Sequence, residues 1–469
     1  MYWQTTVYFF GALLLLACAS CHPQGTQRPP SEAAVVRTVI VGDAAETDAL
    51  SPRDALPQWR PTSRLRDAND AVSSGGVCRF DTDEASGGET IDGAATDGAF
   101  GEPAPDGLRA VAPQHPHIRY WGRVDCTAQP GPAFAYPAVS IRAVFTGAAL
   151  DVLLRVDTAD EGPQSGHYFD VIIDDAPPTL LRVTPGETRY SLARGLSAGP
   201  HTLEIVKRNE SSYRGIENYG KVHFLGLHIS ADGALLPVPP RAVRLEFIGD
   251  SITCGYGNER AVPDPTRAHH TTLHSNAAAA WGALTARALD ADYMAVAYSG
   301  RGVARNYGGD SSATFPNIYA RTLPDEPSSP RFDSASFAPD LLVVNLGTND
   351  YSEGLTPETF GALRREFVQA YTAFLTTLRE NYPQTPFVLA VGPMMSDAYP
   401  PGLNAWTAIQ ADVAEIRQQR LVAGDENIYL LVLPPQTPPF GEDWHPAPHT
   451  HHDMALQLLR LIQQHELLP

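Results

Sequence analysis

From about His117 onward, short runs of alternating apolar and polar residues follow one another, separated by turn residues. Val139, Ile141 and Phe145 alternate in this way with Ser140 and its neighbours. This period-2 pattern predicts β-strands with one buried face. The predicted strands span residues 139–145, 150–156, 167–174, 180–183, 188–192, 201–207 and 221–230. Such a series indicates an all-β sandwich, and we expect a jelly roll. Taken alone, a module of this kind is also compatible with a lectin.

The proline-rich run at 237–240 is interpreted as a rigid joint, because predicted strands and helices alternate after it. Continuous apolar sequences such as Leu341-Leu342-Val343-Val344 are typical of parallel strands that are covered on both faces. The predicted strands span residues 243–248, 293–298, 341–346, 387–391 and 428–433. The pattern therefore predicts a three-layer α/β domain of flavodoxin-like type.

The clearest helix of this second part is predicted to begin at Thr356 as N-cap, with Pro357 in the first turn. Apolar residues then recur at helical spacing and are expected to face the sheet. These residues are Phe360, Leu363, Phe367, Tyr371, Phe374 and Leu378.

The amino-terminal part of the chain shows neither pattern. Residues 7–17 form an apolar run too short for a comfortable membrane span, which predicts a signal peptide and export, although a positively charged leader is missing. Cys18 and Cys21 each end a short sequence that resembles the bacterial lipobox, so we expect a membrane tether through one lipidated cysteine. The alternative is an ordinary signal peptide whose cysteines are incidental.

Residues 22–113 are rich in Ala, Gly, Asp, Pro, Ser and Thr and contain few large apolar residues. Such a segment buries too little surface to offset its ordering entropy, which predicts a disordered tether. The expected organisation is therefore a signal segment at 1–21, a disordered linker at 22–113, a β-sandwich at 114–236 and an α/β domain at 237–469.

Charge and cysteine content limit the possible partners. The 469 residues carry a formal net charge of −19, which argues against nucleic acid or an anionic membrane surface and favours neutral substrates. Beyond the two amino-terminal cysteines, Cys78, Cys126 and Cys254 remain, so at least one thiol is unpaired if the protein is exported. We expect Cys254 to be a small buried residue. The sequence does not indicate an oligomeric state.

Three predicted strands end in short polar motifs. They are Gly249-Asp250-Ser251, Ser299-Gly300-Arg301-Gly302 and Gly347-Thr348-Asn349-Asp350. The carboxyl ends of parallel strands meet at one edge of a sheet, so these motifs are expected to lie close together. A serine nucleophile needs donors aimed at the oxygen that becomes negative, and a serine N–H, a glycine N–H and an asparagine amide supply three. Gly-Asp-Ser alone is also a common turn sequence.

A fourth motif, Asp443-Trp444-His445-Pro446, lies near the end of the chain. An imidazole that takes the proton of a serine turns the hydroxyl into a useful nucleophile, and a carboxylate on the other ring nitrogen fixes the tautomer. His445 is therefore the candidate base, with Asp443 or Glu442 as the orienting acid. A lone histidine in such a loop is usually structural, but here it completes a set of four motifs.

These motifs resemble the four blocks of the SGNH hydrolase superfamily, and more closely carbohydrate esterase family 2, whose members join a small β-sandwich to an SGNH domain. The resemblance covers residues from about 118 to the end. It includes Tyr120-Trp121-Gly122-Arg123, Lys207-Arg208-Asn209-Glu210, the long first block Gly249 to Gly257 and the three later blocks. No role is assigned to Asn209, which stands where the family usually has threonine.

The resemblance implies a role for each matching residue. Ser251 would be the nucleophile, His445 the base, and Gly300 and Asn349 oxyanion donors together with the Ser251 amide. Asp443, two residues before the histidine, would be the acid, as in this esterase family. The wider superfamily uses the position of Glu442, and some family members use a backbone carbonyl instead.

The resemblance also implies an esterase that removes O-acetyl groups from a polysaccharide such as xylan or glucomannan, with no cofactor or metal. Trp444 and Tyr351 are expected either to stack on a sugar ring or to wall the pocket. A lipase or thioesterase of the same superfamily, and a glycan-binding lipoprotein with an inactive site, are the alternatives.

Two groups of histidines invite a metal hypothesis, which we do not favour because neither has a metal-binding spacing. The first group is His269, His270 and His274, and the second is His449, His451 and His452. We expect the second group to cap a final helix that starts near Asp453.

Overall fold

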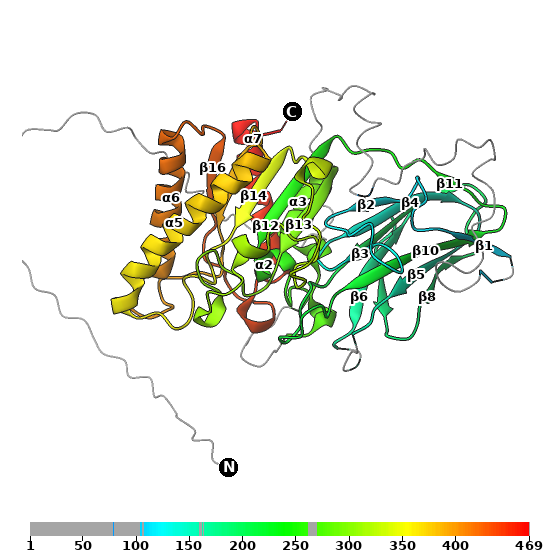
Figure 1. The fold of residues 1–469 in the computed structure, drawn as a ribbon, viewed down its shortest axis with the longest axis horizontal. Helices are drawn as coiled ribbons and strands as arrows, with labels where there is room; N and C mark the ends of the chain where they lie inside the picture. Colours follow the sequence, from blue (N-terminus) through cyan, green and yellow to red (C-terminus); the bar gives the residue numbers. More distant parts are fainter. Residues whose placement is uncertain are drawn as a thin grey trace, which may run out of the picture. The chain divides into compact units, whose positions relative to one another are not determined.

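The computed structural model describes residues 78, 104–105, 107–158, 162, 164–260 and 270–468 (Figure 1). The expected signal peptide and the two candidate lipidation sites, Cys18 and Cys21, lie outside the described residues, as does most of the expected linker. No helix of the described part is long and apolar enough to cross a membrane.

The first domain is a sandwich of two antiparallel sheets, as the alternating pattern predicts. One sheet has the order β1-β10-β5-β8 with β3 beside β10, and the other has the order β11-β4-β9-β6-β7 with β2 beside β4. The strands of the first sheet are β1 (Leu108–Val111), β3 (Ala133–Phe134), β5 (Ala149–Arg155), β8 (Arg189–Arg194) and β10 (Val222–Ser230). Those of the second are β2 (Arg119–Trp121), β4 (Ser140–Thr146), β6 (His167–Ile173), β7 (Thr179–Val183), β9 (Pro200–Lys207) and β11 (Leu235–Leu236).

Every second residue of these strands packs into the space between the two sheets, which excludes water from a continuous apolar core. The buried members of this core include Ile141, Phe145, Val152, Leu154, Phe169, Val171, Phe224 and Leu227. The strands that the alternation predicts are thus confirmed, each within a few residues of its expected bounds.

The amino-terminal boundary of the sandwich differs from the prediction. Strand β1 lies inside the segment expected to be a linker, and it pairs antiparallel with β10 from Leu108 opposite Ser230. Cys78, also in that segment, is buried and forms a disulfide with Cys126. A four-residue edge strand and one cysteine within a polar sequence produce no detectable periodicity, which is why the pattern missed them. Cys254 is a free, buried thiol, as expected.

The second domain is a parallel sheet with helices on both faces, again as predicted. Its strand order is β13-β12-β14-β15-β16. The strands are β12 (Val243–Gly249), β13 (Ala291–Ala297), β14 (Leu341–Asn345), β15 (Phe387–Val391) and β16 (Ile428–Val432). The helices are α2 (Ser251–Cys254), α3 (Trp281–Ala288), α4 (Phe315–Ile318), α5 (Pro357–Asn381), α6 (Ala405–Val422) and α7 (Pro448–His465). Five short 3₁₀ segments complete the described part: Thr272–His274, Ala277–Ala279, Tyr307–Gly309, Ser334–Phe337 and Glu442–Trp444.

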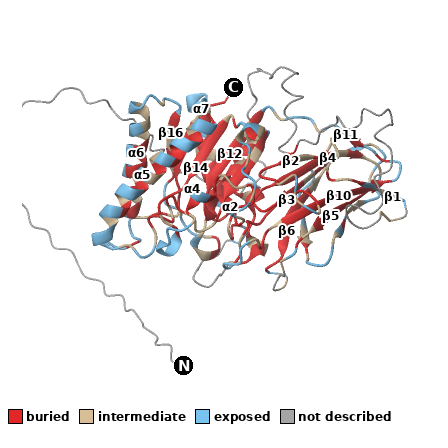
Figure 2. Cartoon of the chain, viewed as in Figure 1, coloured by how far each residue is buried: buried red, intermediate tan, exposed pale blue. Residues whose placement is uncertain are grey.

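Successive residues of the parallel strands face opposite helical layers, so most positions of these strands are apolar. Leu342 and Val344 of β14 belong to the apolar cluster that includes α5 and α6. Leu341 and Val343 of the same strand belong to the cluster that includes α3 and α7. Figure 2 shows the result as a sheet that is buried along its length between helices whose outer faces are exposed.

The ends of two helices test the sequence interpretation. Helix α5 starts at Pro357 after Thr356, whose backbone N–H donates to Thr359 Oγ1 at 3.1 Å, as the capping pattern predicts. Helix α7 begins at Pro448, five residues before the expected start near Asp453. The group of histidines at 449–452 therefore lies inside the helix instead of capping it. Its buried member, His451, accepts the Trp281 N–H at 3.3 Å through Nδ1.

The two domains contact each other through buried charged groups. Arg123, just after β2, donates to the backbone carbonyls of Tyr319 and Arg321 and lies 3.7 Å from the carboxylate of Glu246 in β12. Its guanidinium also lies over the Tyr319 ring at 4.5 Å. A buried guanidinium needs several acceptors and an aromatic face to offset its desolvation, and this one has both.

A second buried ion pair joins the sandwich to the sheet of the other domain. Arg142 of β4 donates to Asp292 at the start of β13 at 2.5 Å, and both side chains are buried. Removing one member of such a pair leaves an uncompensated charge. The sandwich is therefore fixed directly to two strands of the α/β sheet.

Candidate active site

Ser251 lies directly beyond the carboxyl end of β12, at the first position of the short helix α2. Asp250 is the N-cap of this helix, and its carboxylate accepts the Ile252 N–H at 3.0 Å. Ser251 is only 8% exposed, so its hydroxyl is presented from a shielded position.

His445 brings the fourth motif to the same place. Its Nε2 lies 2.8 Å from Ser251 Oγ. Its Nδ1 lies 3.1 Å from each of two backbone carbonyl oxygens, those of Glu442 and Asp443. A carbonyl oxygen only accepts hydrogen bonds, so Nδ1 must carry the proton. Nε2 is then a free acceptor that can take the proton of the serine hydroxyl.

The Asp443 carboxylate does not orient the imidazole, which differs from the expected arrangement. It accepts instead the hydroxyl of Tyr256 at 2.9 Å and the backbone N–H of His270 at 3.1 Å. The reason is local backbone geometry: Asp443 and Trp444 both have positive φ, at 47° and 65°. This left-handed turn directs the main-chain carbonyls toward the ring, while the carboxylate points to the loop at 270.

The carboxylate of Glu442, the alternative acid, also points away from the imidazole. It is fully buried and accepts the Thr271 N–H at 2.8 Å and the His274 ring at 2.7 Å. The carboxylates of Glu442 and Asp443 thus accept the backbone N–H groups of two consecutive loop residues. Glu442 binds Thr271, and Asp443 binds His270. Within the described residues no group of histidine, cysteine and carboxylate side chains is arranged to hold a metal ion.

The imidazole stacks on an aromatic ring that its own motif holds in place. The rings of His445 and Tyr256 are 4.1 Å apart and nearly parallel, and His270 stacks on the other face of Tyr256 at 3.6 Å. Burial lowers the pKa of His445 to about 4 and that of His270 to about 3. The His445 imidazole is therefore neutral and able to accept a proton at ordinary pH.

Gly300 follows β13 beside Ser251, in a backbone conformation with φ of 76° that glycine adopts without strain. Within the described part of the chain, neither the Gly300 N–H nor the Ser251 N–H has a hydrogen-bond acceptor. Asn349 follows β14, and its side-chain amide donates to the Arg301 carbonyl at 2.9 Å and to Asp250 at 3.4 Å. The structure thus brings all four motifs to one edge of the sheet.

Asp350, which sequence reasoning left without a role, holds the loop that follows Gly300. Its buried carboxylate accepts the N–H groups of Val303 at 2.9 Å, Ala304 at 2.7 Å and Arg305 at 3.0 Å. Burial raises the pKa of Asp350 to about 6, and that of Asp250 to about 7. The only signal for this role was the position of Asp350 next to Asn349.

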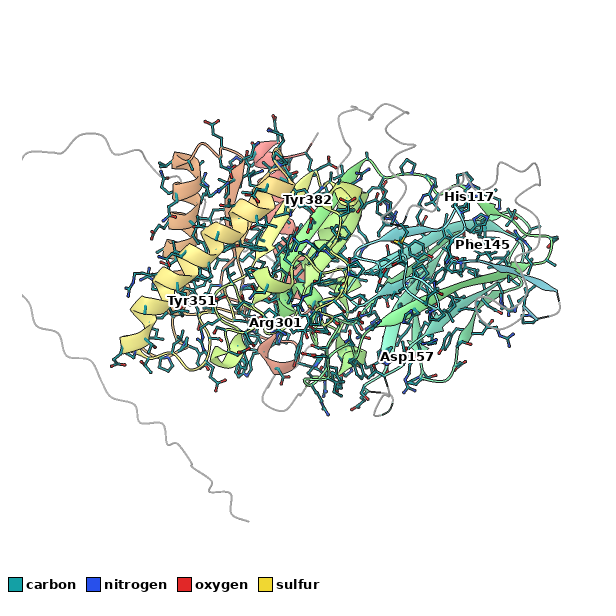
Figure 3. The ribbon with its side chains drawn as sticks, viewed as in Figure 1. His117, Phe145, Asp157, Arg301, Tyr351 and Tyr382 are labelled. Carbon is teal, nitrogen blue, oxygen red and sulfur yellow. A yellow bond between two sulfur atoms is a disulfide. The ribbon has the colours of Figure 1, made fainter. Side chains whose placement is uncertain are left out.

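The two aromatic residues expected to contact a sugar have opposite environments. Trp444 is 51% exposed and directly precedes His445. Tyr351 is fully buried; it lies against helix α5, where its ring packs on Phe367 and its hydroxyl donates to Asp412 (Figure 3). Tyr351 therefore cannot stack on a substrate, and the expectation for it was wrong. The residue after the third motif faces the core because the chain turns there toward α5.

An exposed aromatic side chain that the sequence did not single out lies next to Gly300. Tyr307 is 57% exposed, and its backbone N–H donates to the Gly300 carbonyl at 2.8 Å. Tyr307 belongs to a long polar loop, and nothing in the sequence of that loop singled out this residue.

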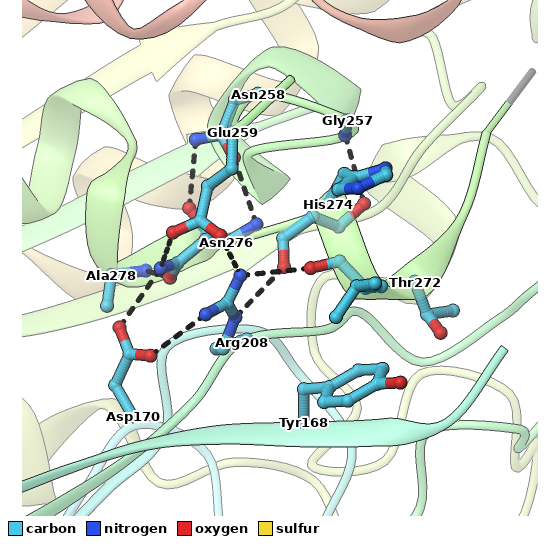
Figure 4. A network of polar contacts seen from close by, with 12 residues as sticks. Tyr168, Asp170, Arg208, Gly257, Asn258, Glu259, Thr272, His274, Asn276 and Ala278 are labelled. Carbon is cyan, nitrogen blue, oxygen red and sulfur yellow. Dashed lines mark hydrogen bonds and ion pairs between the residues drawn. The ribbon is translucent and has the colours of Figure 1, made fainter. Parts of the chain in front are cut away.

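The segment from Lys207 to Glu210 connects the sandwich to this site. Arg208 donates to Asp170 within the sandwich and to Glu259 in the loop after α2, while Asn276 bonds both of these carboxylates at 3.0 and 2.7 Å (Figure 4). These contacts fix the loop that carries His270.

Comparison with known proteins shows the family of this chain. Residues 120–239 match the family described as Carbohydrate esterase 2 N-terminal, and residues 247–453 match the GDSL-like Lipase/Acylhydrolase family. The chain is 30% identical over 357 residues to an acetylxylan esterase / glucomannan deacetylase of Cellvibrio japonicus, covering 76% of this chain and 90% of the relative. The chain belongs to carbohydrate esterase family 2. As the resemblance of its motifs predicts, this family 2 esterase is a carboxylic ester hydrolase.

Other relatives extend the comparison. The esterase is 33% identical over 352 residues to the cellulase/esterase CelE of Acetivibrio thermocellus, which covers 74% of this chain but only 39% of CelE. A solved family two carbohydrate esterase from Clostridium thermocellum, in complex with cellohexaose, superposes with a TM-score of 0.65 and 31% identity, and the match covers 75% of this chain and all of that one.

The lowered pKa of His445 predicts how its ring titrates. NMR of the side-chain nitrogens should show a neutral imidazole, protonated on Nδ1, with a midpoint near pH 4. A histidine in an unfolded chain has a pKa of about 6.5. The unfolded state therefore binds the proton more tightly than the folded state, and protonation favours unfolding. The contribution of this residue to stability is therefore present above about pH 6.5 and is lost as the pH falls toward 4. A midpoint near 6.5 in the folded protein would contradict the buried position.

The carbonyl contacts of His445 predict a small effect of Asp443→Asn. The asparagine oxygen can still accept from Tyr256 and His270, and Nδ1 keeps its two carbonyls, so kcat should fall less than about tenfold. In a site where a carboxylate holds the histidine, the same change costs about 10⁴-fold. Steady-state kinetics on a soluble acetyl ester measures this, and a loss of the larger size would restore Asp443 as the acid.

Proposed function

We propose that this esterase removes O-acetyl groups from a polysaccharide, with xylan or glucomannan as the substrate class, through an acetyl-enzyme on Ser251. The observation that carries the proposal is the 2.8 Å contact between Ser251 Oγ and His445 Nε2, in a ring whose other nitrogen faces two carbonyls. The names of the relatives, an acetylxylan esterase / glucomannan deacetylase among them, support the substrate class.

In the first step, His445 Nε2 takes the proton of Ser251 as its oxygen attacks the acetyl carbonyl carbon. The carbonyl oxygen becomes negative in the tetrahedral intermediate and accepts from the N–H groups of Ser251 and Gly300. Asn349 supplies a third donor by exchanging its longer bond, the 3.4 Å contact to Asp250, for the substrate oxygen. The imidazolium then gives its proton to the departing sugar hydroxyl.

In the second step, water enters in place of the sugar and His445 removes its proton. The resulting hydroxide attacks the acetyl carbonyl, acetate leaves, and the proton returns to Ser251. The two carbonyls on Nδ1 stabilise the imidazolium through its N–H without a full counter-charge. This is sufficient because the imidazolium exists only while a negative oxygen lies beside it.

Exposed aromatic rings suit a sugar chain, because a pyranose presents an apolar face to an aromatic plane. Trp444 and Tyr307, each more than half exposed, are attached to the base and to the Gly300 loop, respectively. We propose that a sugar ring stacks on Trp444 while its acetyl group reaches Ser251. An acyl-chain lipase would instead need an apolar channel at this place.

We also propose that the protein is exported and tethered through a lipidated cysteine, Cys18 or Cys21. The disulfide between Cys78 and Cys126 supports an oxidising compartment, since such bonds are rare in the cytosol. The proposed organisation is a signal segment at 1–21, a linker at 22–113, a β-sandwich at 114–236 and an α/β domain at 237–469. The sandwich also includes β1, which lies at the end of the linker range.

Ser251→Ala should abolish acetate release from acetylated xylan and glucomannan, with a loss of at least about 10⁴-fold in kcat, because among the described residues the hydroxyl that contacts His445 Nε2 is that of Ser251. The folded state should be retained, as the hydroxyl contributes little to packing. Ser336→Ala, at a half-buried serine, is the matched control. Equal turnover by wild type and Ser251→Ala would remove Ser251 as the nucleophile, and preference for long-chain acyl esters would favour a lipase.

Trp444→Ala should raise the KM for an acetylated polysaccharide about 2- to 12-fold, which corresponds to the loss of about 0.5–1.5 kcal/mol of ring stacking. The KM for 4-nitrophenyl acetate, which has no sugar, should change little. Measuring both substrates with the same preparation separates stacking from damage to His445. A parallel rise for both would show that Trp444 shapes the site and does not bind the glycan.

A further inference from the structure

A glutamate of the sandwich domain ends inside the active-site region of the hydrolase domain. Glu210 lies three residues beyond β9 and is 7% exposed. Its Oε2 accepts the Ser299 backbone N–H at 2.7 Å, and its Oε1 accepts the Ser299 hydroxyl. Oε2 also lies 3.7 Å from the Cys254 thiol, a weak donor. All three donors belong to the hydrolase domain.

The residues that Glu210 binds are neighbours of the proposed catalytic groups. Ser299 immediately precedes Gly300, and Cys254 is the last residue of helix α2, which begins at Ser251. One carboxylate therefore holds the loop of an oxyanion donor and contacts the helix of the nucleophile. Hydrogen bonds to a carboxylate are shorter and stronger than neutral ones, so they restrict the peptide that they hold.

A buried carboxylate close to an oxyanion would oppose the developing charge unless it were balanced. Lys207, in the same segment, is also buried; its ammonium donates to the backbone carbonyls of Asn209 and Glu210. Burial raises the pKa of Glu210, and the hydrogen bonds from Ser299 and the positive charge of Lys207 oppose this rise. Burial also lowers the pKa of Lys207 to about 7. The segment thus places a buried lysine near the carboxylate that binds Ser299.

We propose that Glu210 is a positioning residue for the esterase reaction: by fixing Ser299 it aims the Gly300 N–H at the acetyl oxygen of the transition state. The inference rests on the proposed function, in which Gly300 is an oxyanion donor. It makes the sandwich a part of the catalytic unit, because the donor loop is held by a residue of the other domain. Donors contribute to catalysis only when they point to the oxygen of the intermediate, so a small displacement of Gly300 lowers the rate.

The experiment compares Glu210→Ala and Glu210→Gln with Asp292→Ala in the full chain. Asp292 is a matched control because it is also a buried carboxylate at the domain contact, but it binds Arg142 at the opposite end of β13. With 4-nitrophenyl acetate, Glu210→Ala should lower kcat about 100-fold, as expected for the loss of one donor, and change KM less than about threefold. Glu210→Gln should recover about tenfold of this loss, since its amide oxygen can accept the Ser299 N–H.

A second measurement tests the oxyanion site directly. Phenylboronic acid forms a tetrahedral adduct with a reactive serine, so its inhibition constant should rise for Glu210→Ala in parallel with the fall in kcat. Asp292→Ala should lower the melting temperature but keep kcat and the inhibition constant within about threefold of wild type. A purely structural role for Glu210 would instead give equal losses for the two alanine variants.

Each outcome decides one point. The inference is overturned if Glu210→Ala keeps kcat and boronate affinity within about threefold of wild type, or if it loses activity only in proportion to Asp292→Ala. If Glu210→Ala does not fold, wild-type values for Glu210→Gln overturn the inference and a tenfold loss supports it. Full activity of Ser251→Ala on the same ester would overturn the proposed function, independently of how the Glu210 variants behave.

Discussion

The hydrogen bond between Ser251 and His445 depends on a constraint of parallel sheets: all strands deliver their carboxyl ends to one edge. Strands β12, β13 and β14 are adjacent, so the residues that follow them are brought together without long loops. The histidine comes from the turn before α7, and the packing of that helix on α3 sets its position. The apolar strands that sustain the sheet are therefore also what assembles the site.

The histidine is oriented by main chain, which changes how the site is stabilised. The two carbonyls on Nδ1 become available because Asp443 and Trp444 adopt a left-handed conformation that non-glycine residues seldom occupy. The surrounding contacts hold this turn: the Asp443 carboxylate binds Tyr256 and His270, and Glu442 binds Thr271. The acidic residues therefore act on the shape of the loop, and the loop acts on the ring.

Much of the fold could be predicted from the sequence because its signals are periodic. The sandwich strands alternate, the parallel strands are continuously apolar, and helix α5 has a cap and an apolar face. Strand β1 could not be predicted, since an edge strand of four residues gains its stability from pairing with β10 and not from its own pattern.

The site could be predicted only in so far as its motifs follow the ends of strands. Ser251, Gly300, Asn349 and His445 do meet at one edge, but the orientation of each side chain depends on contacts between distant segments. Nothing near Asp443 in the sequence indicates that its carboxylate turns toward His270. Likewise Tyr351, next to a motif, is buried by α5, whereas Glu210 enters the site from another domain. Such outcomes follow from packing and are invisible to local patterns.

The measurement that tests the account most directly is peptide mapping of the acetyl-enzyme. The esterase is mixed with 4-nitrophenyl acetate, quenched in acid within the first turnover, digested and analysed by mass spectrometry. The account predicts an acetyl group on the peptide that contains Ser251, and its absence when His445 is replaced by alanine. An acetyl group on a different residue, or rapid turnover with no acetylated peptide at any time, would contradict it.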